Sequence, residues 1–163
     1  MAEKTNASRI LERLNVPFSL IEYEVDPENL DAFHVADSLG QDISTVFKTL
    51  VLHGDKNGYF VCVIQGDKEV DLKKAAKISG NKKVAMIPMK ELLPLTGYIR
   101  GGCTAIGMKK NFPVFLDENA LIHPQIHVSA GKRGLQMKLA PLDYIKVTNS
   151  TVGDLISQPL PSS

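Results

Sequence analysis

The chain has 163 residues, of which 44% are hydrophobic and 23% are charged, and its formal net charge is +1. This length allows one domain with a core that needs no disulfides, and the composition excludes a disordered or fibrous protein. No apolar run reaches the length of a membrane span and the first ten residues lack the apolar segment of a signal peptide, so we expect a cytoplasmic protein without a membrane partner.

The near-neutral total hides an uneven distribution of charge. Residues 1–67 carry 5 Lys and Arg against 11 Asp and Glu, whereas residues 68–138 carry 13 against 5. A surface that binds a polyanion requires such a basic segment, although scattered and solvated lysines give the same count.

Capping and turn residues mark the predicted elements along the chain. Asn6 belongs to a type that caps helices, and Gly40 belongs to the type that ends them. Asn57-Gly58, between two β-rich runs, supplies the positive-φ residues of a hairpin turn. The first predicted elements are a helix from Asn6 to about Leu14, a strand from Pro17 to Val25, a helix from Asp31 to Leu39, and strands over Val46–His53 and Tyr59–Ile64. They are followed by a helix from Asp71 to Ile78, a strand over Val84–Ile87, a helix from Pro88 through Leu93, and a glycine-rich irregular segment over Thr96–Gly107. The last predicted elements are strands over Val114–Leu116, Gln125–Ser129 and Leu135–Leu139, and one helical turn over Pro141–Tyr144.

The predicted strands outnumber the predicted helices and alternate with them. This pattern predicts an α/β domain built on a mixed sheet. We expect this single domain to occupy residues 1–157, and the Pro- and Ser-rich residues 158–163 to form a frayed tail.

Lys48 is unusual because it stands inside the apolar run over residues 46–52. A lysine at such a position either points outward from a half-exposed strand or is aimed into a cleft, where it supplies a compact positive charge for a phosphate. Taken alone, the position favours the outward lysine.

A second unusual segment is Gly-Gly-Cys-Thr-Ala-Ile-Gly over residues 101–107. Gly102 and Gly107 have the spacing of a phosphate-binding P-loop, but Met108 stands where that motif requires lysine, which excludes a nucleoside triphosphatase of that class. Paired glycines let the backbone approach a ligand closely, and they also form plain surface turns.

The sequence indicates neither a protein nucleophile nor a metal centre. Cys103 would need a base within reach to act as a nucleophile, and none of the 4 histidines stands in a recognised catalytic signature. His123 and His127 have the spacing of metal ligands on a helix, but Pro124 and the strand-like residues around His127 argue against a helix there. We therefore expect no metal and no other cofactor.

The third unusual segment is Ser-Ala-Gly-Lys-Arg-Gly over residues 129–134, which follows a predicted strand. Its flexible backbone and two cations suit an anion held by amides and side chains together. A solvated hairpin turn is the alternative interpretation.

In this order, the three segments resemble the YbaK family of aminoacyl-tRNA editing deacylases, relatives of the editing insertion of bacterial prolyl-tRNA synthetase. The resemblance runs from about Ile10 to Leu155 and includes residues 71–77, 96–98 and 109–110. It implies a mixed, partly closed sheet with flanking helices. The implied activity is removal of mischarged cysteine from tRNA(Pro), with Cys-tRNA(Cys) as a further substrate. The implied partners are the acceptor end of aminoacyl-tRNA and prolyl-tRNA synthetase, and DNA is not among them.

The resemblance also implies a mechanism in which the substrate's own thiol attacks its ester carbonyl and leaves as a cyclic thiolactone. Lys48 would bind phosphate at the 3′ end of the tRNA, and the backbone of Gly101 and Gly102 would position the ester, so these three are the implied catalytic residues. A helix from Asp71 would contact the RNA backbone. The other implied contacts to substrate or tRNA are Tyr23, Thr49, Ser129, Gly131, Lys132 and Arg133.

Three positions depart from the family pattern. Thr104-Ala105 replaces a Ser-Pro pair after the double glycine, and Gln136 replaces an acidic residue. These residues are candidate determinants of amino-acid specificity. They leave two alternatives open, namely a deacylase that removes another small amino acid with water as nucleophile, and a non-catalytic module that binds the acceptor end of tRNA.

Overall fold

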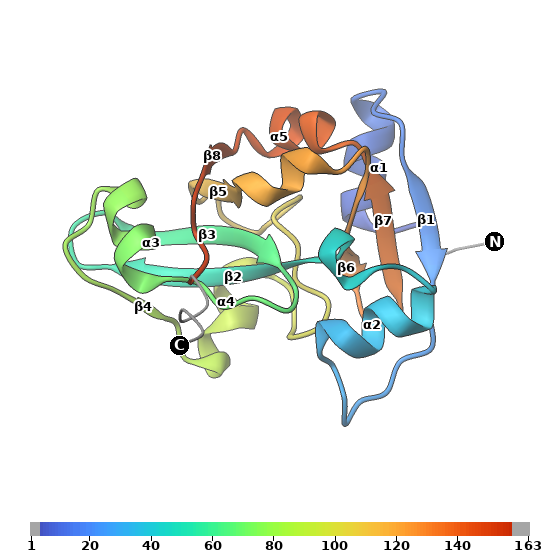
Figure 1. Cartoon of the computed structure of the whole chain (residues 1–163), viewed down its shortest axis with the longest axis horizontal. Coiled ribbons are helices and arrows are strands. Elements are labelled where there is room, and N and C mark those ends of the chain that lie inside the picture. Colours follow the sequence, from blue (N-terminus) through green and yellow to red (C-terminus); the bar gives the residue numbers. More distant parts are fainter. Residues whose placement is uncertain (1–3, 158–163) are drawn as a thin grey trace, which may run out of the picture.

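Two β-sheets form the framework of the protein (Figure 1). The computed structural model describes residues 4–157, so the expected tail over residues 158–163 lies outside the described residues. The smaller sheet has the strand order β1 (Ser19–Glu22), β7 (Leu135–Leu139), β6 (Ile126–Lys132). The larger sheet has the strand order β4 (Val84–Met86), β2 (Phe47–Gly54), β3 (Gly58–Gln65), β5 (Val114–Asp117), β8 (Thr151–Gly153).

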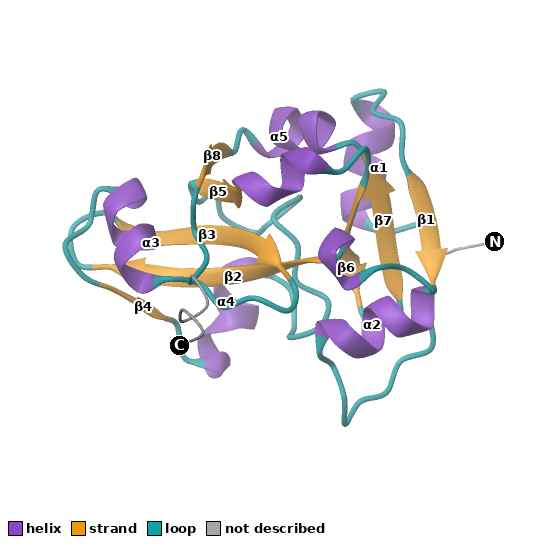
Figure 2. Cartoon of the chain, in the orientation of Figure 1, coloured by secondary structure: helices purple, strands orange, loops and turns teal. Residues whose placement is uncertain are grey.

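Helices and helical turns connect the strands and cover the sheets (Figure 2). No helix within residues 4–157 is long and apolar enough to cross a bilayer. The α-helices are α1 (Asn6–Arg13), α2 (Ala32–Leu39), α3 (Leu72–Ser79), α4 (Leu92–Thr96) and α5 (Pro141–Thr148). The 3-10 helices are η1 (Ile43–Thr45), η2 (Met89–Glu91) and η3 (Glu118–Ile122).

The larger sheet is mixed, which confirms the predicted fold class. Strand β2 pairs antiparallel with β4 and with β3, whereas β5 pairs parallel with both β3 and β8. The smaller sheet is antiparallel throughout. A single parallel bridge between Val46 and His127 connects the start of β2 to β6, so the two sheets meet there.

The β2–β3 hairpin forms where the sequence predicts it. Gly54 pairs with Gly58 at the turn, and Thr49 pairs with Val63 farther along. Gly58 has a φ of 72°, the left-handed conformation that the turn requires and that glycine adopts without a steric penalty.

The cap of α1 differs from the prediction by one residue. Thr5, not Asn6, is the N-cap, because its hydroxyl accepts a hydrogen bond from the Ser8 amide and the Ser8 hydroxyl completes a capping box. The same Thr5 hydroxyl donates to the carbonyl of Ala130 at 2.6 Å. The cap therefore also attaches α1 to β6.

Several other boundaries differ because tertiary pairing decided them. The predicted strand from Pro17 to Val25 is shortened to β1, and the single turn predicted over residues 141–144 extends to the whole of α5. The helix predicted from Pro88 is split into η2 and α4. Strand β8 has only three residues and no periodic pattern that would have revealed it, and it exists because it pairs with β5.

Apolar side chains cover both faces of the larger sheet. On β3, Val61 and Val63 belong to the main core, and Phe60, Cys62 and Ile64 belong to a second core on the opposite face, to which α3 contributes Ala75. This double burial fixes the position of β2 within the sheet, and β2 carries two of the predicted site residues.

Candidate functional site

The double-glycine segment packs directly on the hairpin between β6 and β7. A Cβ atom on Gly102 would lie 2.9 Å from the Lys132 Cα and 3.1 Å from the Arg133 amide nitrogen, so only glycine fits without a backbone shift. Arg133 Nε donates to the Arg100 carbonyl at 2.7 Å. The structure thus brings together the second and third segments singled out from the sequence.

Gly101 borders a small hollow of about 150 Å³. Pockets for drug-sized ligands measure about 300–1,000 Å³, so this hollow suits a small chemical group. Thr49, Arg100 and Cys103 are the lining residues with polar side chains. The complete lining is Thr49, Leu50, Val51, Met86, Ile87, Met89, Leu92, Arg100, Gly101 and Cys103.

Lys48 lies in a second, neighbouring hollow of about 270 Å³, with Glu69 and Val70. Burial lowers the pKa of its ammonium group, and the nearby charges of Glu69 and Asp67 act in the opposite direction. The two hollows share Leu50 and Met86 in their linings, so they meet at one edge of the larger sheet.

Cys103 lines the first hollow, but its environment does not activate the thiol. Burial raises the pKa of Cys103 to about 12, with a smaller opposite effect from Thr96. The thiol is therefore protonated at neutral pH, and a protonated thiol is a poor nucleophile.

Ser129 and Gly131 shape the hairpin segment that faces the glycines. The Ser129 Oγ accepts a hydrogen bond from the Gly131 amide at 3.2 Å, next to a β-bulge in the pairing of β6 with β7. Gly131 has a φ of 102°, and a Cβ there would lie 3.1 Å from the ring of Tyr98. Tyr98 in turn donates its hydroxyl proton to the Ile106 carbonyl at 2.6 Å. Lys132 is exposed at the outer end of β6.

The other predicted residues lie away from the first hollow. The Tyr23 side chain packs beside Val46 in a small cluster on α2, and its backbone amide donates to Gly134. Thr104 is fully buried, and Ala105 borders a different hollow that Ile10 also lines. Neither Thr104 nor Ala105 lines the hollow at Gly101, although both follow Gly101 closely in the sequence.

Gln136 lies beside Ser129 on the β6–β7 hairpin and is only 5% exposed. Its Oε1 atom is buried without a hydrogen-bond partner, and so is the Nε2 atom of His127 on the same face. The other ring nitrogen of His127 contacts the Thr45 hydroxyl at 3.2 Å, and burial lowers the pKa of this imidazole. Among residues 4–157, no group of three or more His, Cys, Asp or Glu side chains is placed to hold a metal ion.

Sequence reasoning missed Arg100 and the apolar part of the lining. Arg100 borders the hollow beside Gly101, and its position directly before the double glycine was the available signal. The approach of Met86 from β4 and of Leu92 from α4 had no signal in the sequence, because both depend on how the edge of the larger sheet is covered.

The chain is similar to known proteins over nearly its whole length. The family model described as the aminoacyl-tRNA editing domain matches residues 26–147. A protein of Enterococcus faecalis (strain ATCC 700802 / V583) named "Putative Cys-tRNA(Pro)/Cys-tRNA(Cys) deacylase EbsC" is 49% identical over 96% of this chain and 95% of its own length.

A longer protein and a solved structure are also similar. The proline–tRNA ligase of Fervidobacterium nodosum (strain ATCC 35602 / DSM 5306 / Rt17-B1) is 30% identical over 51% of this chain and 14% of its own length. A crystal structure described as a "putative trans-editing enzyme for prolyl tRNA synthetase" superposes with a TM-score of 0.82 at 24% identity, covering 96% of this chain and 100% of that one. At that identity, the superposition shows a common fold.

Proposed function

The chain belongs to the aminoacyl-tRNA editing domain family, and from this membership we propose that it is a deacylase that removes mischarged cysteine from tRNA(Pro) and also accepts Cys-tRNA(Cys). The relative of 49% identity bears a name for this activity and covers the chain almost completely.

One observation carries the mechanism: the residues that line the hollow at Gly101 include no carboxylate and no imidazole. The ionisable side chains of this lining are Arg100 and Cys103, and Cys103 is held protonated by burial. A hollow with this lining has no general base to activate water, whereas a cysteinyl ester brings its own nucleophile.

In the proposed reaction, the substrate sulfur attacks the carbonyl carbon of its own ester. The carbon–oxygen bond to the ribose breaks, the thiol proton is transferred to the departing ribose oxygen, and cysteine leaves as a thiolactone. The oxygen of the carbonyl gains negative charge during this step, and backbone amides at Gly101 and Gly102 are the groups proposed to stabilise it. Thr49 lines the same hollow and is proposed to contact the amino acid.

Lys48 is proposed to hold the phosphate next to the terminal ribose. Its hollow shares Leu50 and Met86 with the hollow at Gly101, so a ligand with its ester in one hollow and its phosphate in the other spans a continuous surface. A half-buried ammonium group is less well hydrated than an exposed one, which favours its pairing with a phosphate.

The hairpin segment from Ser129 to Arg133 is proposed to form the opposing wall. Its contact with Gly102 and the hydrogen bond from Arg133 to Arg100 support this placement. Prolyl-tRNA synthetase is the proposed partner that selects the tRNA body. The hairpin wall and the hollows at Gly101 and Lys48 are proposed to contact only the acceptor end, so they do not distinguish one tRNA body from another.

The deciding experiment is single-turnover release of amino acid from Cys-tRNA(Pro), Ser-tRNA(Pro) and Ala-tRNA(Pro). Cysteine should be released far faster than serine, which has almost the same shape but a much weaker nucleophile. Equal rates for cysteine and serine would contradict the thiol mechanism. They would favour a deacylase that removes another small amino acid with water as the nucleophile.

A further inference from the structure

A trough extends from the proposed ester site along one face of β2. Thr49, Val51 and His53 alternate along the strand and therefore share this face. Beyond the hollow at Gly101 lies another of about 260 Å³, and both include Met86 and Ile87 in their linings. The trough therefore continues from Gly101 toward the β2–β3 turn.

The middle of the trough is aromatic and carries no lysine or arginine. His53 and Tyr59 lie edge to face with their ring centroids 4.6 Å apart, and the Tyr59 hydroxyl donates to Glu91 at 3.4 Å. The complete lining is His53, Tyr59, Ala85, Met86, Ile87, Pro88 and Glu91. Such a surface suits unpaired bases, which stack on aromatic rings, and it does not suit phosphates.

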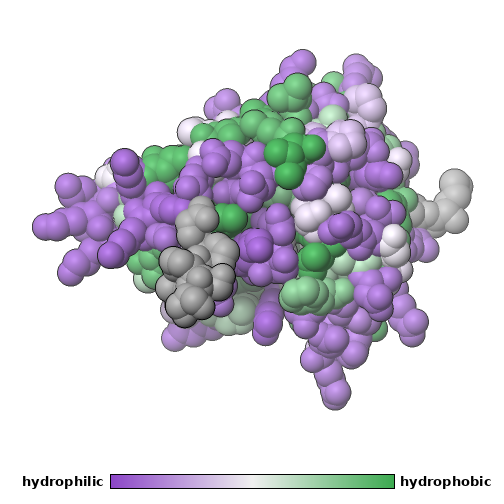
Figure 3. Space-filling view, viewed as in Figure 1, coloured by the Kyte–Doolittle hydropathy of each residue, from purple (hydrophilic) through white to green (hydrophobic). Residues whose placement is uncertain are grey.

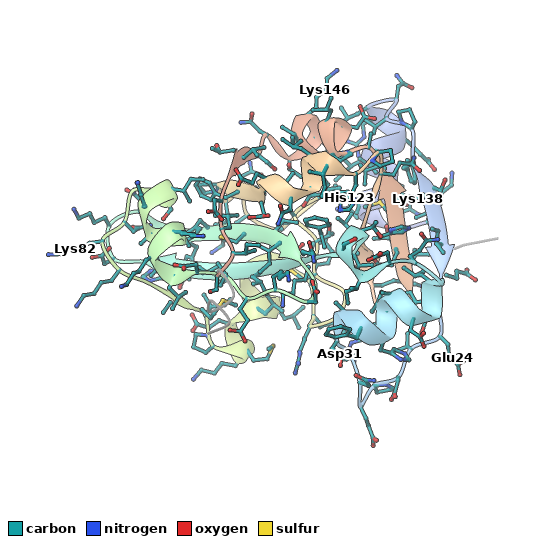
Figure 4. The ribbon with its side chains drawn as sticks, viewed as in Figure 1. Glu24, Asp31, Lys82, His123, Lys138 and Lys146 are labelled. Atoms are coloured by element: carbon teal, nitrogen blue, oxygen red, sulfur yellow. The ribbon has the colours of Figure 1, made fainter. Side chains whose placement is uncertain are left out.

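Four exposed lysines stand at the far end of the trough, and we call this group the lysine tip: Lys56, Lys77, Lys82 and Lys83. Lys56 comes from the β2–β3 turn, Lys77 from the last turn of α3, and Lys82 and Lys83 from the segment that leads into β4. Figure 4 shows Lys82 at this end of the molecule, and the same end is strongly hydrophilic in Figure 3.

The backbone beneath the lysine tip is held rigidly by two side chains. The Asp55 carboxylate accepts hydrogen bonds from the amides of Lys82 and Lys83, at 2.9 and 3.1 Å. The Asn81 amide oxygen accepts from the amides of Lys56 and Asn57, at 3.0 and 2.7 Å. The turn and the α3–β4 segment therefore form one unit, and the lysines project from fixed points.

Within residues 4–157, the ammonium groups of the lysine tip form no close ion pairs. Within the part of the chain that the structure describes, no carboxylate oxygen lies within 4.0 Å of the ammonium group of any of these four lysines. The nearby Asp55 is bound mainly by backbone amides, which lower the pKa of its carboxyl group, and the charge of Lys56 makes a smaller contribution in the same direction. By contrast, Lys74 on the same helix as Lys77 is paired with Asp154 at 2.8 Å, so it contributes little to this surface.

We propose that the lysine tip binds the phosphate backbone of the acceptor-stem duplex while the trough holds bases of the unpaired 3′ end of the same RNA. From the phosphate at Lys48 the RNA backbone would return over the edge of the larger sheet at Met86, the residue that lines all three hollows. The proposal rests on the proposed function, and it centres the RNA contact on the end of the β2–β3 hairpin, with Lys77 as the contribution of helix α3.

The length of the trough supports this arrangement. From Thr49 to Gly54 the strand extends about 17 Å at 3.3–3.4 Å per residue. A strand that stays stacked as in a duplex rises about 3.4 Å per nucleotide, so about five stacked nucleotides span this length, and fewer span it when the chain is extended. An RNA whose last residue lies at Gly101 therefore reaches the lysine tip near the start of its duplex.

The test measures binding of uncharged RNA, so that it does not depend on catalysis. The probe is a hairpin RNA that consists of the acceptor stem of tRNA(Pro) with its unpaired 3′ end, and affinity is measured across a rising KCl series. For the Lys82→Gln/Lys83→Gln variant, the slope of log K against log salt should fall by about 1.8, since each lost phosphate contact removes about 0.9. Lys146→Gln, an exposed lysine on α5, should leave the slope unchanged.

A second probe, the same hairpin without its unpaired 3′ end, separates the two parts of the surface. This shorter RNA should bind more weakly to the unmodified protein. In the double variant, the slope of log K against log salt should fall by the same amount with this RNA as with the full hairpin. An unchanged slope in the double variant with either RNA would overturn the proposal, and so would an equal loss in Lys146→Gln. Loss of binding to phosphatidylserine vesicles but not to RNA would also overturn it.

Failure of the proposed function gives a different result. If the double variant lowers the salt slope of hairpin binding but the unmodified protein releases no cysteine, RNA binding by the lysine tip is supported and the deacylase activity is contradicted. If cysteine is released and the double variant keeps the salt slope of the unmodified protein, the deacylase activity is supported and RNA binding by the lysine tip is contradicted.

Discussion

Lys48 and Thr49 are consecutive residues of β2 whose side chains lie on opposite faces of the larger sheet. Thr49 lines the hollow at Gly101, whereas Lys48 lines the hollow with Glu69. The two hollows meet at Leu50 and Met86 on the edge of the sheet, so the proposed site wraps around that edge. A ligand that reaches both residues must have its phosphate on one side and its ester on the other.

Replacement of Lys48 by alanine should lower kcat/KM for Cys-tRNA(Pro) by roughly 10–100-fold, since a hydrogen bond to a charged group contributes about 1.5–3 kcal/mol. Stability should hardly change, because burial already disfavours the charged form of this lysine and lowers its pKa. The matched control is Lys146→Ala on α5, which Figure 4 shows on another part of the surface. Similar losses in the two variants would remove Lys48 from the proposed site.

Gly102→Ala should separate the double-glycine segment from the hairpin. The new Cβ would lie 2.9 Å from the Lys132 Cα, so the backbone must shift, at a cost of about 1–3 kcal/mol. Urea unfolding would measure this loss, and deacylation should fall even at temperatures where the variant is folded. Gly40→Ala is the control, because Gly40 has a φ of 66° but no atom within 4 Å of the new Cβ. It should cost stability of the order of 1 kcal/mol without affecting turnover.

Cys103→Ala should retain most of the activity, because the proposed nucleophile belongs to the substrate. The assay is single-turnover cysteine release at saturating protein. A loss of 100-fold or more in a variant that remains folded would make Cys103 a participant and would contradict the mechanism.

The protein should become less stable in alkaline solution as its buried thiols lose protons on unfolding. Burial raises the pKa of Cys62 and of Cys103 from 9.0 to about 12. The folded state therefore keeps its protons up to a higher pH than the unfolded state does. The contribution of the neutral thiols is complete below pH 9 and is lost as the pH rises toward 12.

Urea unfolding at a series of pH values across this window would measure the fall in the free energy of unfolding. Cys62→Ala should make the fall shallower, since one of the two thiols is then absent. A profile that is flat for the unmodified chain, or identical in the two proteins, would contradict the assigned burial effect.

Gln136→Met should leave stability unchanged or raise it by about 1 kcal/mol, because the Oε1 atom is buried without a partner and the replacement has a similar volume. Asn81→Leu offers the contrast. Asn81 is also buried, but its Oδ1 accepts from two backbone amides, so its loss should cost about 1–3 kcal/mol. Thermal unfolding compares the two variants. A larger loss for Gln136→Met than for Asn81→Leu would show that the Gln136 amide has a partner in solution.

Local sequence signals predicted the elements whose formation depends on neighbouring residues. The Asn57-Gly58 turn and the helix that ends at Gly40 are examples, because a positive φ at a single glycine fixes the chain direction there. The N-cap was misplaced by one residue because Thr5 and Asn6 are both capping types, and the hydrogen bond from Thr5 to Ala130 favours Thr5. Strand β8 was not predicted, because three residues are too few to show the alternation of apolar and polar side chains that marks a strand.

The sequence by itself determined the mixed α/β class, the three unusual segments and the absence of a P-loop, because each depends on residue types at short spacing. Only the tertiary structure decided which of these residues meet. Gly102 packs against Lys132 although thirty positions separate them, whereas Thr104, three positions after Gly101, is buried and does not line the hollow at Gly101. The faces of Lys48 and Thr49 were decided in the same way, because burial of apolar side chains on both sides of the larger sheet fixes the rotation of β2.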